Sequence, residues 1–591
     1  MDDTEKPPRT AARTAGSGGM AMPLIVGVTG HRDLLPAEVQ DIRERVRGFL
    51  CDLVEQHPDS VVTLLTGLAK GADQLVAEEA LALEIPYSVI LPLPRVMYVE
   101  DFRTTGRREN FDRLCDAAVE VLELPIAPGN SAEAIREGGE GRAKQYAQAG
   151  VFMSAHCHVL LALWDGKDSH NLGSTPHVVR YHQHGVMPGY TQPGPASRKM
   201  LADDESDLVY HIVVSRNRTD GQPRGVLNPL ECWWFTSDQH TPKNETLPAR
   251  YRMVFACSNE FNRDAQKHAQ QIRENARTLH AGDGAEHLPK SVRNVDRIFA
   301  IADWLATFYQ KKSLLVLGST HVLALSMGIM YIIYTNVFSD TAFIIAFVLL
   351  FALTTAIHSY GKRRDWQRRA LDYRALAEGL RVQYYWAASG VAAEPFGKDA
   401  YDNFLQMQDA DLGWIRNVMR AAGTVGDAAP HCDESGLAYV EREWIGRGKT
   451  GQLGYYLAMG EERLQKQRRT ERQSMVGLWI GIVAIAVIVI IGVNGAETVR
   501  DPLIWLMGVI LLLAVVRQSY AHATAGSEQI KQYEFMAGIF YNARRRLASS
   551  VNAEERRRVL RALGDAVLEE HAQWILMRRE RSVGPGKSDP T

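Results

Sequence analysis

Three short segments in the first third of the chain combine glycine with cations or hydroxyl side chains, a composition that suits phosphate binding. They are residues 27–32 (GVTGHR), 66–73 (TGLAKGAD) and 164–175 (WDGKDSHNLGST). Glycine lets backbone amides face an anion, and a helix that begins after such a segment adds its positive N-terminus. Arg32 and Lys70 supply positive charge, Arg32 as a planar fork and Lys70 as a point charge. Together the segments predict a site for a nucleotide-like ligand.

Other polar residues in these segments have two interpretations each. Asp73 or Asp165 could accept hydrogen bonds from ribose hydroxyls, although Asp73 also suits the capping of the helix that begins there. His31 either stacks on a base or packs. The clusters at 156–158 and 182–184 hold histidine and cysteine but lack a second ligand pair at zinc spacing, so we expect no metal site. The six cysteines form no CxxC pair, which favours a reducing compartment.

An alternation of strands and helices must position the three segments. Continuous apolar runs, typical of strands buried on both faces, occur at 24–28, 61–65, 87–91, 119–122 and 159–163, with helical stretches between them. This alternation predicts an α/β fold with a doubly wound parallel sheet, whose ligand crevice lies beyond the carboxyl ends of the strands. Because neighbouring strands end at the same edge, we expect the three segments to converge there.

The second half of the chain holds four apolar segments without a charged residue, at 313–334, 341–357, 475–493 and 503–516. A transmembrane helix needs roughly 20 apolar residues, so these predict an all-α membrane region of four transmembrane helices in two hairpins. The helical pattern of 298–308 runs into the first segment without a breaker. Basic residues flank the hairpins at 311–312, 362–364 and 466–472, which predicts that both termini are cytoplasmic.

The two hairpins belong to an internal repeat. Matching residues lie 160 positions apart without a gap: Ser359–Tyr360 and Ser519–Tyr520, Tyr373 and Tyr533, and Trp414–Ile415 and Trp574–Ile575. Repeats of this kind fix the architecture of a chain, and here they predict a duplicated module of two membrane helices with flanking helices. A chance likeness of two unrelated hairpins is the alternative.

The predicted domains follow from these features. Residues 1–22 lack an apolar core and form a disordered leader. Residues 23–255 form the nucleotide-binding domain, whose end, from 186 onward, serves as a sheet extension, a lid or plain packing. Residues 256–425 and 426–591 form the two membrane modules. The net charge of −2 gives no general attraction to nucleic acid, and we expect no nucleic acid partner.

The three glycine segments resemble the SLOG superfamily, which are Rossmann-like domains related to phosphoribohydrolases. In the hydrolase members the third motif ends in a glutamate that helps catalysis, and Val178 stands at that position here, which puts hydrolysis in doubt. The resemblance therefore implies a sensor, not an enzyme, for a nucleotide-derived second messenger such as a cyclic oligonucleotide or an ADP-ribose derivative. It implies binding by Gly27, Thr29, Gly30, His31, Arg32, Thr66, Gly67, Lys70, Gly71, Asp73, Asp165, Gly173, Ser174 and Thr175.

The repeated hairpins resemble SLATT modules, which are two-span membrane modules attached to SLOG domains in bacterial conflict systems. This resemblance implies a multi-pass effector of the bacterial inner membrane that senses a nucleotide signal and permeabilises or disrupts the bilayer, in antiphage defence and as a homo-oligomer. A membrane-anchored nucleotide hydrolase or NAD-processing enzyme is one alternative. A membrane docking or transport protein is another.

Overall fold

The computed structural model describes residues 20–102, 104–191, 207–237, 243–280, 288–391, 404–405, 410–423, 434–446, 448, 451–494, 497–523 and 526–582. The leader predicted for 1–22 lies outside these residues apart from its last three. The chain divides into two compact units. Unit 1 holds Met1–Trp304, Ala375–Asp433 and Leu568–Leu576, and unit 2 holds Leu305–Arg374, Glu434–Val567 and Met577–Thr591.

Unit 1 contains an eight-stranded sheet in the order β4-β3-β2-β1-β5-β6-β7-β8. The first six strands in this order are parallel, and the last two are antiparallel. The strands are β1 (Pro23–Gly30), β2 (Val61–Thr66), β3 (Tyr87–Leu91), β4 (Glu120–Glu123), β5 (Val159–Trp164), β6 (Val209–Val213), β7 (Cys232–Phe235) and β8 (Lys243–Asn244). The predicted doubly wound parallel sheet is confirmed, and the segment after residue 186 extends it by three strands.

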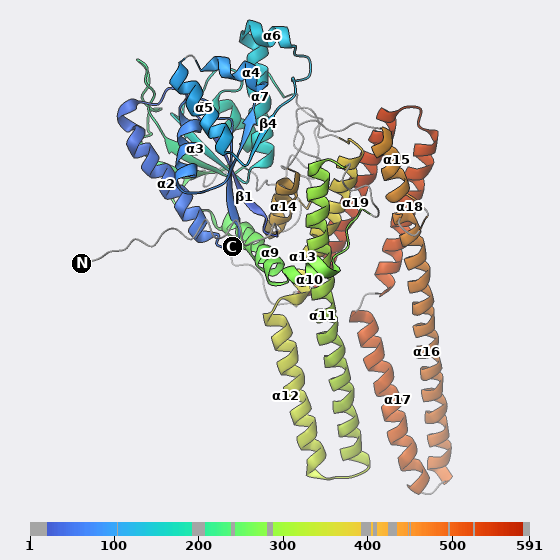
Figure 1. Cartoon of the computed structure of the whole chain (residues 1–591). Coiled ribbons are helices and arrows are strands. Elements are labelled where there is room, and N and C mark those ends of the chain that lie inside the picture. Colours follow the sequence, from blue (N-terminus) through green and yellow to red (C-terminus); the bar gives the residue numbers. More distant parts are fainter. Residues whose placement is uncertain are drawn as a thin grey trace, which may run out of the picture. The chain divides into compact units, whose positions relative to one another are not determined.

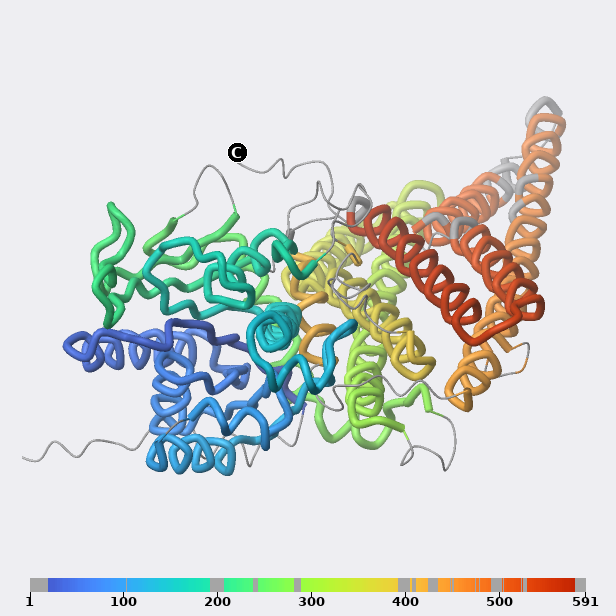
Figure 2. Tube along the Cα trace, turned by 90° about the horizontal axis from the view of Figure 1, so that it is seen from above, coloured from blue at the N-terminus to red at the C-terminus, as the bar shows by residue number. Residues whose placement is uncertain are grey.

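Helices cover both faces of the sheet (Figure 1). The helices α2 (Val39–Gln56), α3 (Ala72–Ala82) and α5 (Thr105–Ala117) connect the strands from β1 to β4. The chain then returns across the sheet to β5, and because such crossovers are right-handed, α7 (Gly139–His156) and α8 (Thr175–His184) lie on the opposite face. Figure 2 shows the blue helices on one side and the cyan and teal helices on the other. The strand order therefore reverses between β1 and β5.

Strand burial explains this layout. Five of the six residues of β5 are buried, as are the six central residues of β1, so both strands lie in the middle of the core.

Two short helices, α4 (Arg95–Tyr98) and α6 (Ala132–Glu137), complete the connections. At the amino ends of the strands lie α9 (Ala249–Lys267) and α14 (Gly413–Gly423), with α10 (Ala269–Asn275) following α9. Every residue of α14 except its last is buried, so this helix is part of the unit 1 core.

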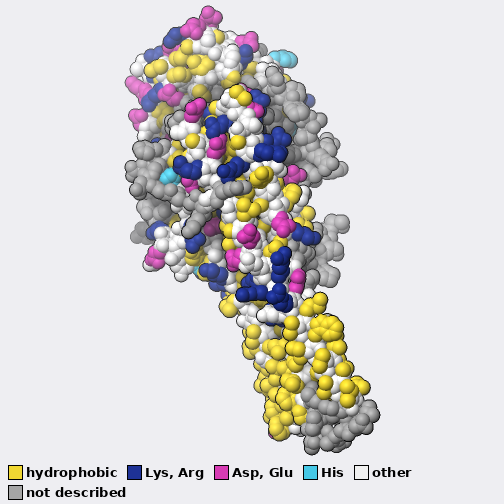
Figure 3. Space-filling view, turned by 90° about the vertical axis from the view of Figure 1, so that its right-hand side faces the viewer, with side chains coloured by type: hydrophobic (Ala, Val, Ile, Leu, Met, Phe, Trp, Pro, Cys, Tyr) yellow, Lys and Arg dark blue, Asp and Glu magenta, His cyan; other side chains and the backbone are white. Residues whose placement is uncertain are grey.

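Unit 2 is helical. It contains most of α11 (Lys290–Asn336), α12 (Thr341–Arg363), the first part of α13 (Trp366–Ala388), α15 (Glu434–Glu443), α16 (Gln452–Asn494), α17 (Glu497–Ala523), α18 (Gly526–Ser549) and most of α19 (Ala553–Ser582). Four of its helices, α11, α12, α16 and α17, are long and apolar enough to cross a membrane. They contain the four predicted apolar segments, and apolar side chains gather on the lower part of the face drawn in Figure 3. The continuous α11 confirms the predicted helix that runs into the first span.

Helix boundaries in unit 2 repeat at the spacing found in the sequence. The helix α12 ends at Arg363 and α13 begins at Trp366, while α17 ends at Ala523 and α18 begins at Gly526. Both boundaries differ by 160 positions, as do the sequence matches. The described ends of these four helices therefore lie at equivalent positions of the two copies, and residues 524–525 are outside the described part of the chain.

The two hairpins are joined by an antiparallel seam between α11 and α17. The Nε2 atom of His321 lies 3.3 Å from Ser519 Oγ. Seven residues further along α11, a Cβ atom on Gly328 would lie 2.4 Å from Leu512 Cδ2, and four residues beyond that Ile332 Cδ1 lies 3.4 Å from the Cβ position of Gly508. Glycine on each side accepts a large side chain from the other helix, a common way for membrane helices to pack closely.

Candidate functional site

The strand order reverses between β1 and β5, so the loops that follow these two strands stand at the position predicted for the ligand crevice. His31 and Asp165 meet there: His31 Nε2 is 3.0 Å from Asp165 Oδ1 and 3.1 Å from the Asp165 amide nitrogen. Both side chains are buried. Burial alone would raise the pKa of the Asp165 carboxyl, but the contact with His31 and a hydrogen bond from the Lys167 amide hold it below its usual range. In doubly wound sheets this position is where ligands bind.

The loop after β2 lies against the loop after β1, and Gly71 makes this possible. Its φ of 91° lies in the region that favours glycine. A Cβ atom at this position would lie 2.6 Å from the carbonyl oxygen of His31, which is too close. That same carbonyl accepts a hydrogen bond from the Ala72 amide at 3.1 Å. Gly71 therefore allows the loops after β1 and β2 to pack directly against each other without a ligand.

Tyr146 of α7 connects these loops to the third segment. The Arg32 guanidinium lies over the Tyr146 ring, 4.6 Å from its centroid. On the other side, a Cβ atom on Gly173 would lie 2.9 Å from the Tyr146 backbone, and the φ of Gly173 is 74°. The Tyr146 hydroxyl donates a hydrogen bond to Asp101, which also pairs with Arg142 at 2.8 Å. Sequence reasoning missed Tyr146, Asp101 and Arg142 because no glycine or strand end marks them.

Asp73 organises the loop after β2 from inside. Its Oδ2 atom accepts a weak hydrogen bond from the Ala69 amide at 3.4 Å and lies 3.4 Å from the Cβ position of Gly67. The N-cap of α3 is Gly71, which places Asp73 in the first turn of that helix. Burial raises the pKa of Asp73 to about 7, against hydrogen bonding and the nearby Arg32 charge that lower it. A change in the charge of the Asp73 carboxyl would therefore affect the conformation of the loop after β2.

Three buried oxygen atoms in the segments after β5 and β6 have no hydrogen-bond partner among the described residues. They are Asp165 Oδ2, Ser174 Oγ and Ser215 Oγ. Ser174 is the N-cap of α8, yet its side chain does not cap the helix. Arg218 lies 3.7 Å from Asp165 Oδ2, which is beyond hydrogen-bond distance. Buried polar atoms are nearly always bonded, so these three suit a polar ligand or water.

The segment after β6 supplies Ser215 and Arg218, which sequence reasoning also missed. Arg216 pairs with Asp33 at 2.9 Å, and the Ser215 amide donates to Glu38 at 2.9 Å. These contacts hold the segment against the loop after β1. The only sequence signal is the serine that follows a strand-like run, a pattern too common to single out.

The remaining predicted binding residues differ in burial: some are packed in the core and others are exposed. Gly27 lies inside β1, where its Cβ position is 2.9 Å from Cys157 Sγ, and Gly30 packs against Ala72 and Leu163. Both glycines are therefore explained by close packing. Thr29 and Thr175 are buried, Lys70 is exposed, and Thr66 Oγ1 accepts a hydrogen bond from the Leu68 amide at 3.2 Å.

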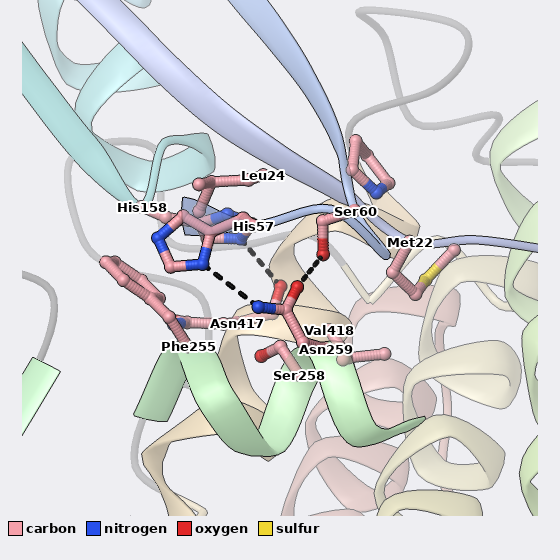
Figure 4. A pocket seen from close by; sticks show the side chains of 11 residues that line it. Met22, Leu24, His57, Ser60, His158, Phe255, Ser258, Asn259, Asn417 and Val418 are labelled. Atoms are coloured by element: carbon pink, nitrogen blue, oxygen red, sulfur yellow. Dashed lines mark hydrogen bonds between the residues drawn. The ribbon is translucent and has the colours of Figure 1, made fainter. Parts of the chain in front are cut away.

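A pocket lies at the opposite end of the strands and contains none of the predicted binding residues (Figure 4). His158, in its lining, accepts a hydrogen bond from the Ile25 amide at 3.0 Å, so its other ring nitrogen must donate to the Asn417 carbonyl at 2.8 Å. Asn259 bonds to both His57 and Ser60, at 3.0 and 2.7 Å. Burial lowers the pKa of both histidines to about 4. These polar groups join α9 and α14 to the sheet, and we assign the pocket a structural role.

In comparisons with known proteins, no family model, curated protein or solved structure matches the chain.

Proposed function

We propose that this chain is a membrane effector that binds a nucleotide-derived anion in the crevice between β1, β2 and β5 and responds by permeabilising or disrupting the bilayer. The observation that carries the proposal is the contact of Arg32 with Tyr146. Through Gly71 on one side and Gly173 on the other, this contact connects all three glycine segments, and the side chains of Arg32 and Lys70 are exposed.

The chemistry of the crevice supports an anionic ligand with hydroxyl groups. Arg32 and Lys70 offer positive charge, and a phosphate suits both. The unbonded oxygens of Ser174 and Asp165 could bond to ribose hydroxyls, because a hydroxyl both donates and accepts. Tyr146 adds an aromatic ring within the same group of contacts. A cyclic oligonucleotide or an ADP-ribose derivative has the phosphate groups, ribose hydroxyls and aromatic base that these protein groups would bind.

The position of Val178 favours sensing over hydrolysis. Val178 is buried in α8, and its Cγ2 atom would be 2.6 Å from a Cβ atom on Gly150 of α7. A glutamate here would lie in a packed helix interface and could not reach the crevice as a general acid or base. The resemblance to SLOG domains without the catalytic glutamate agrees with this proposal, and the resemblance to SLATT modules favours a role in bacterial antiphage defence.

The composition of the apolar helices favours an opening without a selectivity filter. The four apolar segments contain no charged residue that could mark an ion path. His321 and Ser519 bond to each other across the seam between α11 and α17. We therefore propose a hydrophobic opening or lipid disruption by a homo-oligomer, whose helices repack along such seams when the ligand binds.

A ligand screen with a membrane readout tests the proposal. The full chain is reconstituted in vesicles that contain a self-quenched dye, and cyclic dinucleotides, cyclic trinucleotides, ADP-ribose and NAD are added in turn. At least one compound should raise the melting temperature of the protein and release dye. Base release from any compound, measured by chromatography, would favour the enzyme alternative, and a screen with neither a thermal shift nor dye release would contradict the proposal.

A further inference from the structure

Five cations gather where the first hairpin meets the rest of unit 2. Lys311 and Lys312 lie on α11, and Lys362, Arg363 and Arg364 lie at the end of α12; we call these five residues the basic junction. Gly361 brings the two helices close, because its Cβ position is 3.0 Å from Val316 Cγ1. All five residues adjoin the apolar spans, at the depth where lipid headgroups would lie.

The basic junction is not neutralised within the described part of the chain. None of its five residues forms an ion pair there, whereas nearby Arg368 pairs with Asp372 at 3.2 Å. The only carboxylate in the turn after Arg364 is Asp365, whose φ of 49° marks a sharp turn into α13. Five positive charges against one negative charge therefore face the surroundings of the hairpin.

Aromatic rings frame the basic junction as they do at membrane interfaces. Lys312 Nζ lies 4.4 Å from the ring centre of Phe308 and 5.2 Å from that of Trp366. Arg364 lies over Tyr360 at 5.3 Å, and the Tyr360 and Trp366 rings meet edge to face at 5.6 Å. Tyrosine and tryptophan favour the headgroup level of a bilayer, and rings below the cations hold them at that level.

The internal repeat shows that the cations at the end of α12 are not repeated as Lys or Arg at the matching positions of the second copy. Lys362, Arg363, Arg364 and Trp366 correspond to His522, Ala523, Thr524 and Gly526 in the second copy. The second hairpin keeps its basic residues on α16, where Glu471 lies among them and accepts a hydrogen bond from Gln467 at 2.7 Å. A general preference for positive charge beside a membrane would apply to both copies equally. On the face drawn in Figure 3, Lys and Arg side chains border the apolar surface.

We infer that the basic junction is a binding site for the phosphate of an anionic lipid headgroup, held between α11 and the α12–α13 turn. Lysine and arginine beside a span attract anionic lipids through their phosphate charge. The guanidinium groups of Arg363 and Arg364 can bond a phosphate with two parallel hydrogen bonds, and the lysines add point charges. The site needs only that unit 2 lies in a bilayer, and it does not depend on a nucleotide ligand.

Lipid binding to the purified full-length protein tests this inference without any nucleotide. Native mass spectrometry counts bound lipids when phosphatidylglycerol and phosphatidylcholine compete at equal concentration. The wild type should prefer phosphatidylglycerol by about tenfold or more, and the variant Lys362→Gln/Arg363→Gln/Arg364→Gln should lose most of this preference. The matched control Lys466→Gln/Arg468→Gln/Arg469→Gln removes the same charge from α16 and should keep it.

A gain-of-function variant covers the case in which the first variant does not fold. His522→Lys/Ala523→Arg/Thr524→Arg should add a second tightly bound phosphatidylglycerol. Equal binding of both lipids by the wild type, or equal losses in the two glutamine variants, would overturn the inference. Excess inorganic phosphate should leave the bound lipid in place, and displacement by phosphate would show that the junction takes free phosphate instead.

Discussion

The Nε2 atom of His31 lies 3.0 Å from Oδ1 of Asp165, and this contact joins the loops after β1 and β5. It stands where the strand order reverses, since the chain leaves β1 toward β2 on one side and reaches β5 on the other. Ligands of doubly wound sheets bind at such reversals. The contact therefore lies at the position predicted for the ligand site, and the next residue, Arg32, is exposed.

Replacing Arg32 with alanine should weaken ligand binding without unfolding the protein. Arg32 is exposed and lies over Tyr146 at the edge of the crevice, so its removal leaves no cavity. A charge-assisted hydrogen bond contributes about 1.5–3 kcal/mol, which corresponds to a loss of roughly 10- to 100-fold in affinity. Isothermal titration with the best compound of the screen measures it.

The control for Arg32 is Arg45→Ala, because Arg45 is an exposed arginine on α2 away from the glycine segments. Equal affinity of the Arg32 and Arg45 variants would contradict the site. Gly71→Ala is unsuitable as a test, since its Cβ atom would lie 2.6 Å from the His31 carbonyl and would disturb the loop whether or not a ligand binds there.

The sheet could be predicted from the sequence because buried strands leave a plain signal. Pro23–Gly30 and Val159–Trp164 are apolar over most of their length, and the glycines that follow mark their ends. The membrane helices were equally visible, since lipid demands long runs without charge.

The roles of individual residues could not be predicted from the sequence, because they depend on tertiary contacts between elements that are remote in the chain. A glycine that binds phosphate and a glycine that packs against another element look alike in a sequence, and only the contacts of Gly27 and Gly30 identify packing. Tyr146 lies in the middle of a helix and approaches Arg32 only because α7 crosses the far face of the sheet. The burial of α14 likewise depends on residues remote in sequence, such as His158.

Asp73 should make the stability of unit 1 fall as the pH rises. Its pKa is raised by burial to about 7 in the folded chain, while an unfolded aspartate titrates near 3.8. The folded state therefore holds an extra proton between about pH 4 and 7, and its stability decreases through this window by up to about 1.4 kcal/mol per pH unit. Asp73→Asn, which resembles the neutral acid, should reduce this decrease.

Melting temperatures from pH 5 to pH 8 test the prediction for Asp73. The melting temperature of Asp73→Asn relative to wild type should rise with pH, while Glu44→Gln, which alters an exposed residue of α2, should not change the slope. Parallel curves for wild type and Asp73→Asn would show that the carboxyl is already ionised at pH 5.

His158 should give the opposite pH dependence. Its pKa is lowered by burial to about 4, below the ordinary value of 6.5, so the unfolded state binds the extra proton between these values. The stability that the neutral ring provides is complete above about pH 6.5 and is lost as the pH falls toward 4. His158→Phe removes the bonds to the Ile25 amide and the Asn417 carbonyl, and each orphaned group costs about 1–3 kcal/mol.

Thermal unfolding of His158→Phe at pH 7.5 and pH 5 checks both parts. The variant should be clearly less stable than wild type at pH 7.5, and the difference should shrink at pH 5. His57 keeps a lowered pKa in the variant, so some acid sensitivity should remain until His57 is also replaced. A constant difference at the two pH values would mean that the pKa of His158 in the folded chain is not lowered below that of the unfolded chain.

The seam between α11 and α17 should tolerate an exchange of its residues better than a single change. A side chain on Gly328 would strike Leu512, whose Cδ2 atom is 2.4 Å from the Cβ position. Gly328→Leu should therefore separate the helices, at an overpacking cost of about 1–3 kcal/mol, and the exchange Gly328→Leu/Leu512→Gly should restore much of the contact.

Cysteines at His321 and Ser519 report on the seam, because their side chains meet 3.3 Å apart and the spans contain no native cysteine. A short thiol cross-linker followed by mass spectrometry should give a high yield when the two cysteines are placed in the otherwise unchanged chain or in the exchanged variant. The yield should be low when they are placed in Gly328→Leu alone. If the single variant cross-links as well as wild type, the two helices do not pack through Gly328, and the hairpins must be held together at another face.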